Sequence, residues 1–115
     1  MIKIAVDAMG GDNSPEKVIN GIINHHSNNK DVYYKIFGDE NKIKYLLKKK
    51  VDTVNYEIVN TSNKVSSEDS PLEAAKRGKD TSMWLAIESV KKKDCDIVIS
   101  AGNTGALLVI SKLNL

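Results

Sequence analysis

Short runs of β-branched residues alternate along the chain with longer segments whose apolar residues recur at helical spacing. Residues 2–7 (IKIAVD) predict a strand, which the stretch at 9–12 (MGGD) ends in a tight loop. Ser14, Pro15 and Glu16 then give three signals of a helix start, with Ser14 as the N-cap and Pro15 at the first helical position. Apolar spacing predicts one buried face on this helix, formed by Val18, Ile19, Ile22 and Ile23.

The same order of strand, turn and helix follows again. Residues 33–37 predict a second strand, Gly38 and Asp39 a turn, and the next segment a helix. The inner face of that helix is expected to hold Ile43, Leu46 and Leu47. Residues 54–59 alternate as a third strand, and the polar residues 60–70 predict an exposed loop of a length that is often functional.

The last third of the chain repeats the pattern with more apolar segments. Pro71 is expected to open a short helix that Gly78 ends, and apolar residues from Met83 to Val90 predict a longer one. Residues 96–100 (DIVIS) predict a strand that is buried on both faces. Small residues at 101–105 then lead into the start of another helix.

Strands separated by helices predict an α/β fold, a three-layer α/β/α sandwich around a mostly parallel sheet. Ligands in such folds bind beyond the carboxyl ends of the strands, so residues 7–12 and 100–105 are expected on one rim. We expect residues 1–115 to be a single α/β portion with no second domain. The chain stops inside an apolar segment without a C-cap, which predicts that it is truncated.

Length and composition argue against a secreted protein and against a nucleic-acid-binding protein. A length of 115 residues, with 41% hydrophobic and 28% charged, is typical of one small globular domain. The apolar run at the N-terminus is too short for a signal peptide, so a cytoplasmic location is expected. Cys95 is the only cysteine, and a net charge of +2 with Arg77 as the only arginine gives no reason to expect nucleic acid binding.

The turn at 100–105 (SAGNTG) is the most informative candidate site. Small residues let backbone amides approach an anion, and the helix N-terminus adds unpaired N–H groups, which suits phosphate. The candidate residues here are Ser100, Gly102, Asn103, Thr104 and Gly105. The alternative is that the glycines only permit a tight turn, and the motif is not that of a P-loop.

Other candidates have equally plain alternatives. Asp12, which follows Gly10 and Gly11, is suited to orient a substrate or accept a proton, or it caps the next helix. Arg77 and Lys79 bring positive charge near an expected helix start at Ser82, or they form a solvated basic turn. A solvated turn is also predicted for His25 and His26, and a packing role for Cys95.

The motif at 4–12 (IAVDAMGGD) followed by Pro15, together with the motif at 99–107 (ISAGNTGAL), closely resembles the phosphate acyltransferase family of phospholipid synthesis. Arg77, Lys79, Ser82 and Met83 look like that family's basic, Ser-Met segment. The resemblance therefore runs the length of the chain. Members of the family are much longer, so this chain is like their first third. Many relatives have His after Gly-Gly-Asp, whereas this chain has Asn13, which excludes a role for that imidazole.

The resemblance implies a Rossmann-like fold of the isocitrate-dehydrogenase-like kind and a transfer of a fatty acyl group from acyl carrier protein to inorganic phosphate, giving acyl phosphate. It implies no cofactor and no metal. Asp12 and Asn103 would be catalytic, and substrate would be bound by Gly10, Gly11, Arg77, Lys79, Ser82, Ser100, Gly102, Thr104 and Gly105. The full-length enzyme would be a homodimer, with possible peripheral association with the membrane glycerol-3-phosphate acyltransferase.

Two alternatives stay open at this point. One is a phosphotransacetylase-like or isocitrate-dehydrogenase-like enzyme that shares the α/β architecture, although no metal or dinucleotide motif is visible in the chain. The other is a non-catalytic truncated module. If the resemblance holds, we expect the 115-residue chain alone to make no acyl phosphate, because a third of the enzyme lacks the acyl groove and the dimer.

Overall fold

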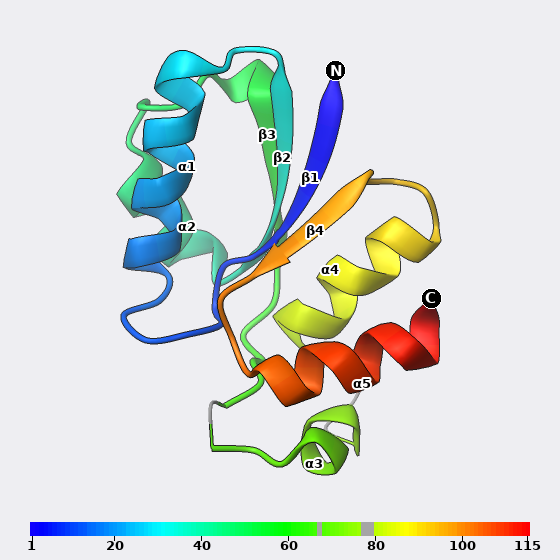
Figure 1. Cartoon of the computed structure of the whole chain (residues 1–115). Helices are drawn as coiled ribbons and strands as arrows, with labels where there is room; N and C mark the ends of the chain where they lie inside the picture. Colours follow the sequence, from blue (N-terminus) through cyan, green and yellow to red (C-terminus); the bar gives the residue numbers. More distant parts are fainter. Residues whose placement is uncertain (67, 77–79) are drawn as a thin grey trace.

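The computed structural model describes residues 1–66, 68–76 and 80–115, with the side chain of Lys76 left out. Strands and helices alternate in the expected order (Figure 1). The elements are β1 (Ile2–Asp7), α1 (Glu16–Asn28), β2 (Val32–Gly38), α2 (Glu40–Leu47), the short 3₁₀ helix η1 (Thr53–Asn55), β3 (Tyr56–Asn60), α3 (Pro71–Lys76), α4 (Ser82–Lys91), β4 (Ile97–Ser100) and α5 (Thr104–Asn114).

The four strands form a parallel sheet in the order β3-β2-β1-β4, which confirms the predicted α/β class. Helices α1 and α2 cover one face, and α4 covers the other, with α5 beside it (Figure 1). Successive residues of β1 point to opposite faces. Ile4 and Val6 therefore pack in a core with residues of α1 and α2, while Ala5 packs with Ala86 of α4.

The start of α1 differs from the prediction. The helix begins at Glu16 with Pro15 at the N-cap, and no side chain caps it. Ser14 donates its hydroxyl proton to the carbonyl oxygen of Gly10 instead. An N-cap hydroxyl must accept from an amide in the first turn. Ser14 lies one residue too early for that, so its predicted capping role is wrong.

The prediction that β4 is buried on both faces is also wrong. Ile97 and Ile99 are 47% and 50% exposed. They pair in register with Ile4 and Val6, so they lie on the sheet face that α1 covers over β1 and β2. Among the described strands β4 is at the edge, and α1 does not extend across it (Figure 1). The apolar pattern correctly predicts that this segment is a strand, but the helices packed on the sheet decide which of its faces is buried.

The third strand and the loop after it were predicted only in part. The expected strand at 54–59 begins at Tyr56, because η1 occupies the preceding residues. The loop has no helix or strand at 61–66, as expected, but its predicted exposure is wrong at three positions. Thr61, Val65 and Asp69 are buried. Val65 packs with residues of α3, α4 and α5, so the loop is part of the core.

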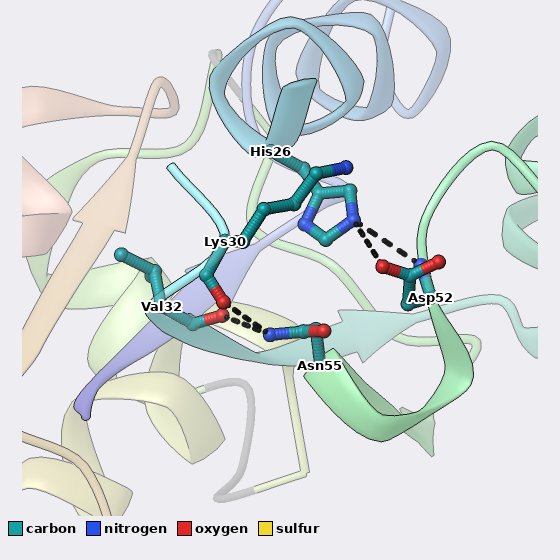
Figure 2. Close-up of polar contacts among 5 residues, drawn as sticks. All are labelled: His26, Lys30, Val32, Asp52 and Asn55. Atoms are coloured by element: carbon teal, nitrogen blue, oxygen red, sulfur yellow. Dashed lines mark hydrogen bonds and ion pairs between the residues drawn. The ribbon is translucent and has the colours of Figure 1, made fainter. Parts of the chain in front are cut away.

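The predicted solvated turn at His25 and His26 is wrong for the second histidine. His26 is 1% exposed, and its Nε2 lies 3.3 Å from the Asp52 carboxylate and 3.3 Å from the Asp52 amide nitrogen (Figure 2). Beside it, Asn55 donates to the carbonyl oxygens of Lys30 and Val32. These contacts join the end of α1 to the starts of β2 and β3. The cluster therefore fixes the amino end of the sheet.

Candidate functional site

The two glycine loops, residues 8–12 after β1 and residues 101–103 between β4 and α5, meet at the carboxyl end of the sheet, as predicted from the fold. Asp7, the last residue of β1, pairs in register with Ser100, the last residue of β4. The loops that follow these residues leave the sheet side by side. Candidate residues that lie far apart in the sequence are thus brought to one rim.

Glycine is required where these loops touch. A Cβ on Gly10 would lie 3.0 Å from both the Cα and the nitrogen of Gly102. Gly11 has a φ of +89°, and a Cβ there would lie 2.5 Å from the carbonyl oxygen of Ala101. L-residues with side chains rarely adopt that φ and cannot tolerate that contact. The diglycine therefore serves the packing of one loop on the other.

The carboxylate of Asp7 lies beneath this contact and is 1% exposed. Its Oδ1 accepts from the hydroxyl of Ser82 at 2.6 Å and from the amide of Met9 at 3.2 Å, and its Oδ2 accepts from the hydroxyl of Ser100 at 2.8 Å. The Ser100 oxygen in turn accepts from the Gly102 amide at 3.2 Å. The hydroxyl protons of Ser82 and Ser100 are therefore already used within the protein.

Asn103 caps α5 and ties down the preceding loop. Its Oδ1 accepts from the amide of Ala106 at 3.0 Å. Its Nδ2 donates to the carbonyl oxygens of Ser66 and Asp69. Asn is a preferred N-cap residue because its oxygen satisfies an amide of the first turn. The Asn103 side chain is thus engaged at both of its polar atoms.

The first two residues of α5, Thr104 and Gly105, present the helix N-terminus to the rim. Within the described part of the chain, neither of these two backbone amides donates a hydrogen bond. Unpaired amides at a helix N-terminus favour anions. Gly105 also contacts α3, since a Cβ there would lie 2.7 Å from Cγ of Pro71. Both the anion-binding and the packing interpretation of Gly105 therefore have a structural basis.

The remaining predicted site residues differ in where they lie. Ser82 is the first residue of α4 and reaches the rim through Asp7. Arg77 and Lys79 lie outside the described residues. Asp12 is exposed and lines a cavity beside α1, and among the described residues no hydrogen bond or ion pair joins it to Asn103. The structure therefore gathers the serines and the glycines around Asp7, whereas Asp12 lies at a cavity that Asp7 and Ala101 also line.

That cavity, of about 550 Å³, lies between α1 and the strands β1 and β4. Asp12, Lys17 and Ser14 line it together with apolar residues that include Ile4, Val6, Ile22 and Ile99. Tyr34 also lines it, and its hydroxyl lies 2.5 Å from Nδ1 of His25. Burial raises the pKa of Tyr34 above its usual value. The cavity thus combines an apolar wall with polar groups beside the β1 loop.

Sequence reasoning placed Asp7 in a motif but did not select it as a site residue. The missing signal was its pairing: Asp7 and Ser100 end two adjacent parallel strands, and Ser82 opens the helix packed against them. No group of three or more His, Cys, Asp or Glu side chains suited to a metal occurs among the described residues. Nor, within those residues, is any helix long and apolar enough to cross a membrane.

Comparison with known proteins identifies the family. A family model described as "Fatty acid synthesis protein" matches residues 2–115. The chain belongs to this family. Relatives similar to it carry the name phosphate acyltransferase, which confirms the resemblance seen in the two glycine motifs.

The phosphate acyltransferase of Pelagibacter ubique is 64% identical over 115 residues, which are 100% of this chain and 34% of that protein. That of Streptococcus uberis is 44% identical over 108 residues, covering 94% of this chain and 31% of the relative. One from Listeria monocytogenes serotype 4a is 46% identical over 107 residues, with 93% and 31% covered. The chain therefore spans about a third of the length of these relatives.

Proposed function

We propose that this chain forms part of an acyltransferase that moves a fatty acyl group from acyl carrier protein to inorganic phosphate, giving acyl phosphate for phospholipid synthesis. The name of its relatives supports the acyl transfer to phosphate. The observation that carries the assignment to a site is the meeting of the two glycine loops at the N-terminus of α5. An anion of phosphate size suits such a place.

The reaction needs no nucleophile from the protein. A phosphate oxygen attacks the thioester carbonyl, the carbonyl oxygen becomes an oxyanion, and the carrier's thiolate leaves as the carbonyl re-forms. The protein has to hold the phosphate at attacking distance and stabilise the oxyanion. Both tasks require N–H or cationic donors.

The donors that we assign are the backbone amides of Asn103, Thr104 and Gly105. Ser100 and Ser82 support the rim rather than bind the phosphate directly, because their hydroxyl protons are donated to Asp7. The Asn103 side chain fixes the first turn of α5 and thereby the direction of these amides. Its catalytic contribution in this proposal comes from the backbone.

The other predicted residues have supporting roles in the proposal. Gly10, Gly11 and Gly102 let the two loops approach each other, and so shape the rim. Arg77 and Lys79 supply positive charge to the phosphate. Asp12 orients the acyl donor from the side of the cavity that it lines. No cofactor takes part.

The partners follow from the same proposal. The acyl donor is acyl carrier protein, the acceptor is inorganic phosphate, and the full-length enzyme works as a cytoplasmic homodimer. In this proposal its product passes to the membrane glycerol-3-phosphate acyltransferase, and we expect a peripheral association with that protein. We expect the 115-residue chain alone to make no acyl phosphate, since it spans only about a third of its relatives.

A hybrid protein tests the function. The chain is joined to the remaining two thirds of the Pelagibacter ubique relative, with which it shares 64% identity. The hybrid is incubated with acyl carrier protein thioester, with and without phosphate, and the carrier thiol that the transfer releases is measured. We expect phosphate-dependent turnover by the hybrid and none by either part alone.

Controls make the result decisive. Circular dichroism and gel filtration establish that the hybrid is folded and has the oligomeric state of the intact relative. A folded hybrid without turnover, under conditions in which the intact relative is active, would contradict the proposed function. Turnover by the 115-residue chain alone would contradict the expectation that it is incomplete.

A further inference from the structure

The Asp7 carboxylate connects three segments of the rim. It accepts from Met9 in the loop after β1, from Ser82 at the start of α4 and from Ser100 at the end of β4. The sequence separation between Asp7 and the two serines is 75 and 93 residues. One side chain therefore joins segments that are far apart in the sequence.

The network continues from Asp7 toward α5. Ser100 donates to Asp7 and accepts from the amide of Gly102, two residues before the start of the helix. A hydroxyl that donates to a carboxylate is fixed in rotation and presents its lone pairs elsewhere. Asp7 thus sets the position of Ser100, and Ser100 sets the position of the loop that leads into α5.

The Asp7 carboxylate is committed to contacts within the protein, although the residue borders the cavity beside α1. Its side chain is 1% exposed, its oxygens are occupied by the donors from Met9, Ser82 and Ser100, and Gly10 covers it so closely that a Cβ there would lie 2.6 Å from its Oδ2. Any influence on bound phosphate must pass through neighbouring residues. This separates Asp7 from Asp12, which is exposed.

We infer that Asp7 is a positioning residue that, through Ser82 and Ser100, fixes the geometry in which the N-terminal amides of α5 bind phosphate. The inference rests on the proposed function for the identity of the anion. Loss of the carboxylate charge removes two charge-assisted hydrogen bonds from hydroxyl groups and frees the β4 loop to move. The affinity of the rim for phosphate then falls although no phosphate contact has been removed.

The test uses the ¹⁵N-labelled chain with inorganic phosphate as the probe. The variants are Asp7→Asn, Ser100→Ala and the double variant, and phosphate dissociation constants are obtained from the amide signals of Thr104 and Gly105. We expect the dissociation constant to rise about tenfold in each single variant and no further in the double variant, since both changes cut the same connection.

Ser89→Ala is the matched control. Ser89 is buried in α4 like Ser82, but its hydroxyl donates to the carbonyl oxygen of Ala86 at 2.6 Å. It should lower the melting temperature without changing phosphate affinity. A folded Asp7→Asn variant with wild-type affinity, or a double variant whose effect is the product of the two single ones, would overturn the inference.

Two further readouts keep the test decisive. If Asp7→Asn does not fold, Ser82→Ala and Ser100→Ala each remove one connection while the carboxylate remains, and both must weaken phosphate binding. If phosphate shifts no amide in the wild type, the proposed anion site fails, and the inference is judged on phosphate-free spectra. Asp7→Asn and Ser100→Ala must then displace the amide signals of residues 102–105 alike, and unchanged signals there would overturn it.

Discussion

Gly10 and Gly102 lie backbone to backbone, so that a Cβ on Gly10 would be 3.0 Å from the Cα of Gly102. The first follows β1 and the second follows β4. Their contact lets the N-terminus of α5 and the β1 loop share one rim. Each glycine motif therefore forms a tight turn and also provides the surface against which the other motif packs.

Gly10→Ala is expected to lower the free energy of unfolding by about 2 kcal/mol, because the new methyl group meets backbone atoms that cannot move away. Gly21→Ala is the matched control. A Cβ on Gly21, in the middle of α1, meets nothing within 4 Å. It should raise stability by about 0.5–1 kcal/mol through helix propensity. Urea unfolding measures both, and equal effects at the two positions would contradict the packing interpretation.

Gly105→Ala separates helix propensity from packing at the start of α5. Its Cβ would lie 2.7 Å from Cγ of Pro71, so the substitution should destabilise the protein by about 1 kcal/mol. In a Pro71→Ala background the obstacle is gone, and the higher helix propensity of alanine should make the same change stabilising. Thermal unfolding of the four proteins gives the sign in each background. A destabilising effect of equal size in both backgrounds would remove Pro71 as the cause.

The sequence predicted those features that depend on neighbours along the chain. Strand β1, the positions of the helices and the shared rim of the two glycine loops all follow from local apolar spacing and from the rule for parallel sheets. The predicted N-cap, Ser14, lies one residue before the observed N-cap, Pro15. The Ser14 hydroxyl therefore donates a hydrogen bond to Gly10 and does not accept one from the helix.

Features that depend on distant partners were missed. The exposure of Ile99 depends on where α1 ends over the sheet, and the burial of Val65 depends on packing with α3, α4 and α5. The role of Asp7 depends on Ser82, 75 residues away. Neither residue type nor spacing reveals such a pairing before the topology is known. The sequence therefore predicted the two motifs and their shared rim, and the structure added the Asp7 carboxylate that joins them through Ser82 and Ser100.

His26→Ala is expected to cost about 2–3 kcal/mol of stability, because it empties a buried site and leaves the Asp52 amide without its acceptor. The neighbouring exposed His25 is the matched control. His25→Ala loses one hydrogen bond, to Tyr34, and should cost about 1 kcal/mol or less. Chemical unfolding at pH 8 compares the two, and equal small costs would restore the solvated interpretation of both histidines.

Tyr34 should make the protein less stable in alkali. Burial raises the pKa of its hydroxyl above the ordinary value of 10.0. Above pH 10 the unfolded chain therefore releases this proton while the folded protein retains it, so the unfolded state binds fewer protons and stability falls as the pH rises. For one group the slope is at most about 1.4 kcal/mol per pH unit.

Tyr34→Phe removes this contribution. It should cost about 1 kcal/mol at pH 8, where the hydrogen bond to His25 is lost, and it should flatten the decline in stability between pH 10 and 11. Burial also raises the pKa of Tyr33, with the nearby Glu57 adding to the effect, so part of the decline should remain. Tyr45→Phe is the control, because Tyr45 is 66% exposed. Free energies of unfolding at pH 8, 10 and 11 decide the matter: a Tyr34→Phe profile parallel to that of Tyr45→Phe would mean that the buried hydroxyl is not the group that titrates.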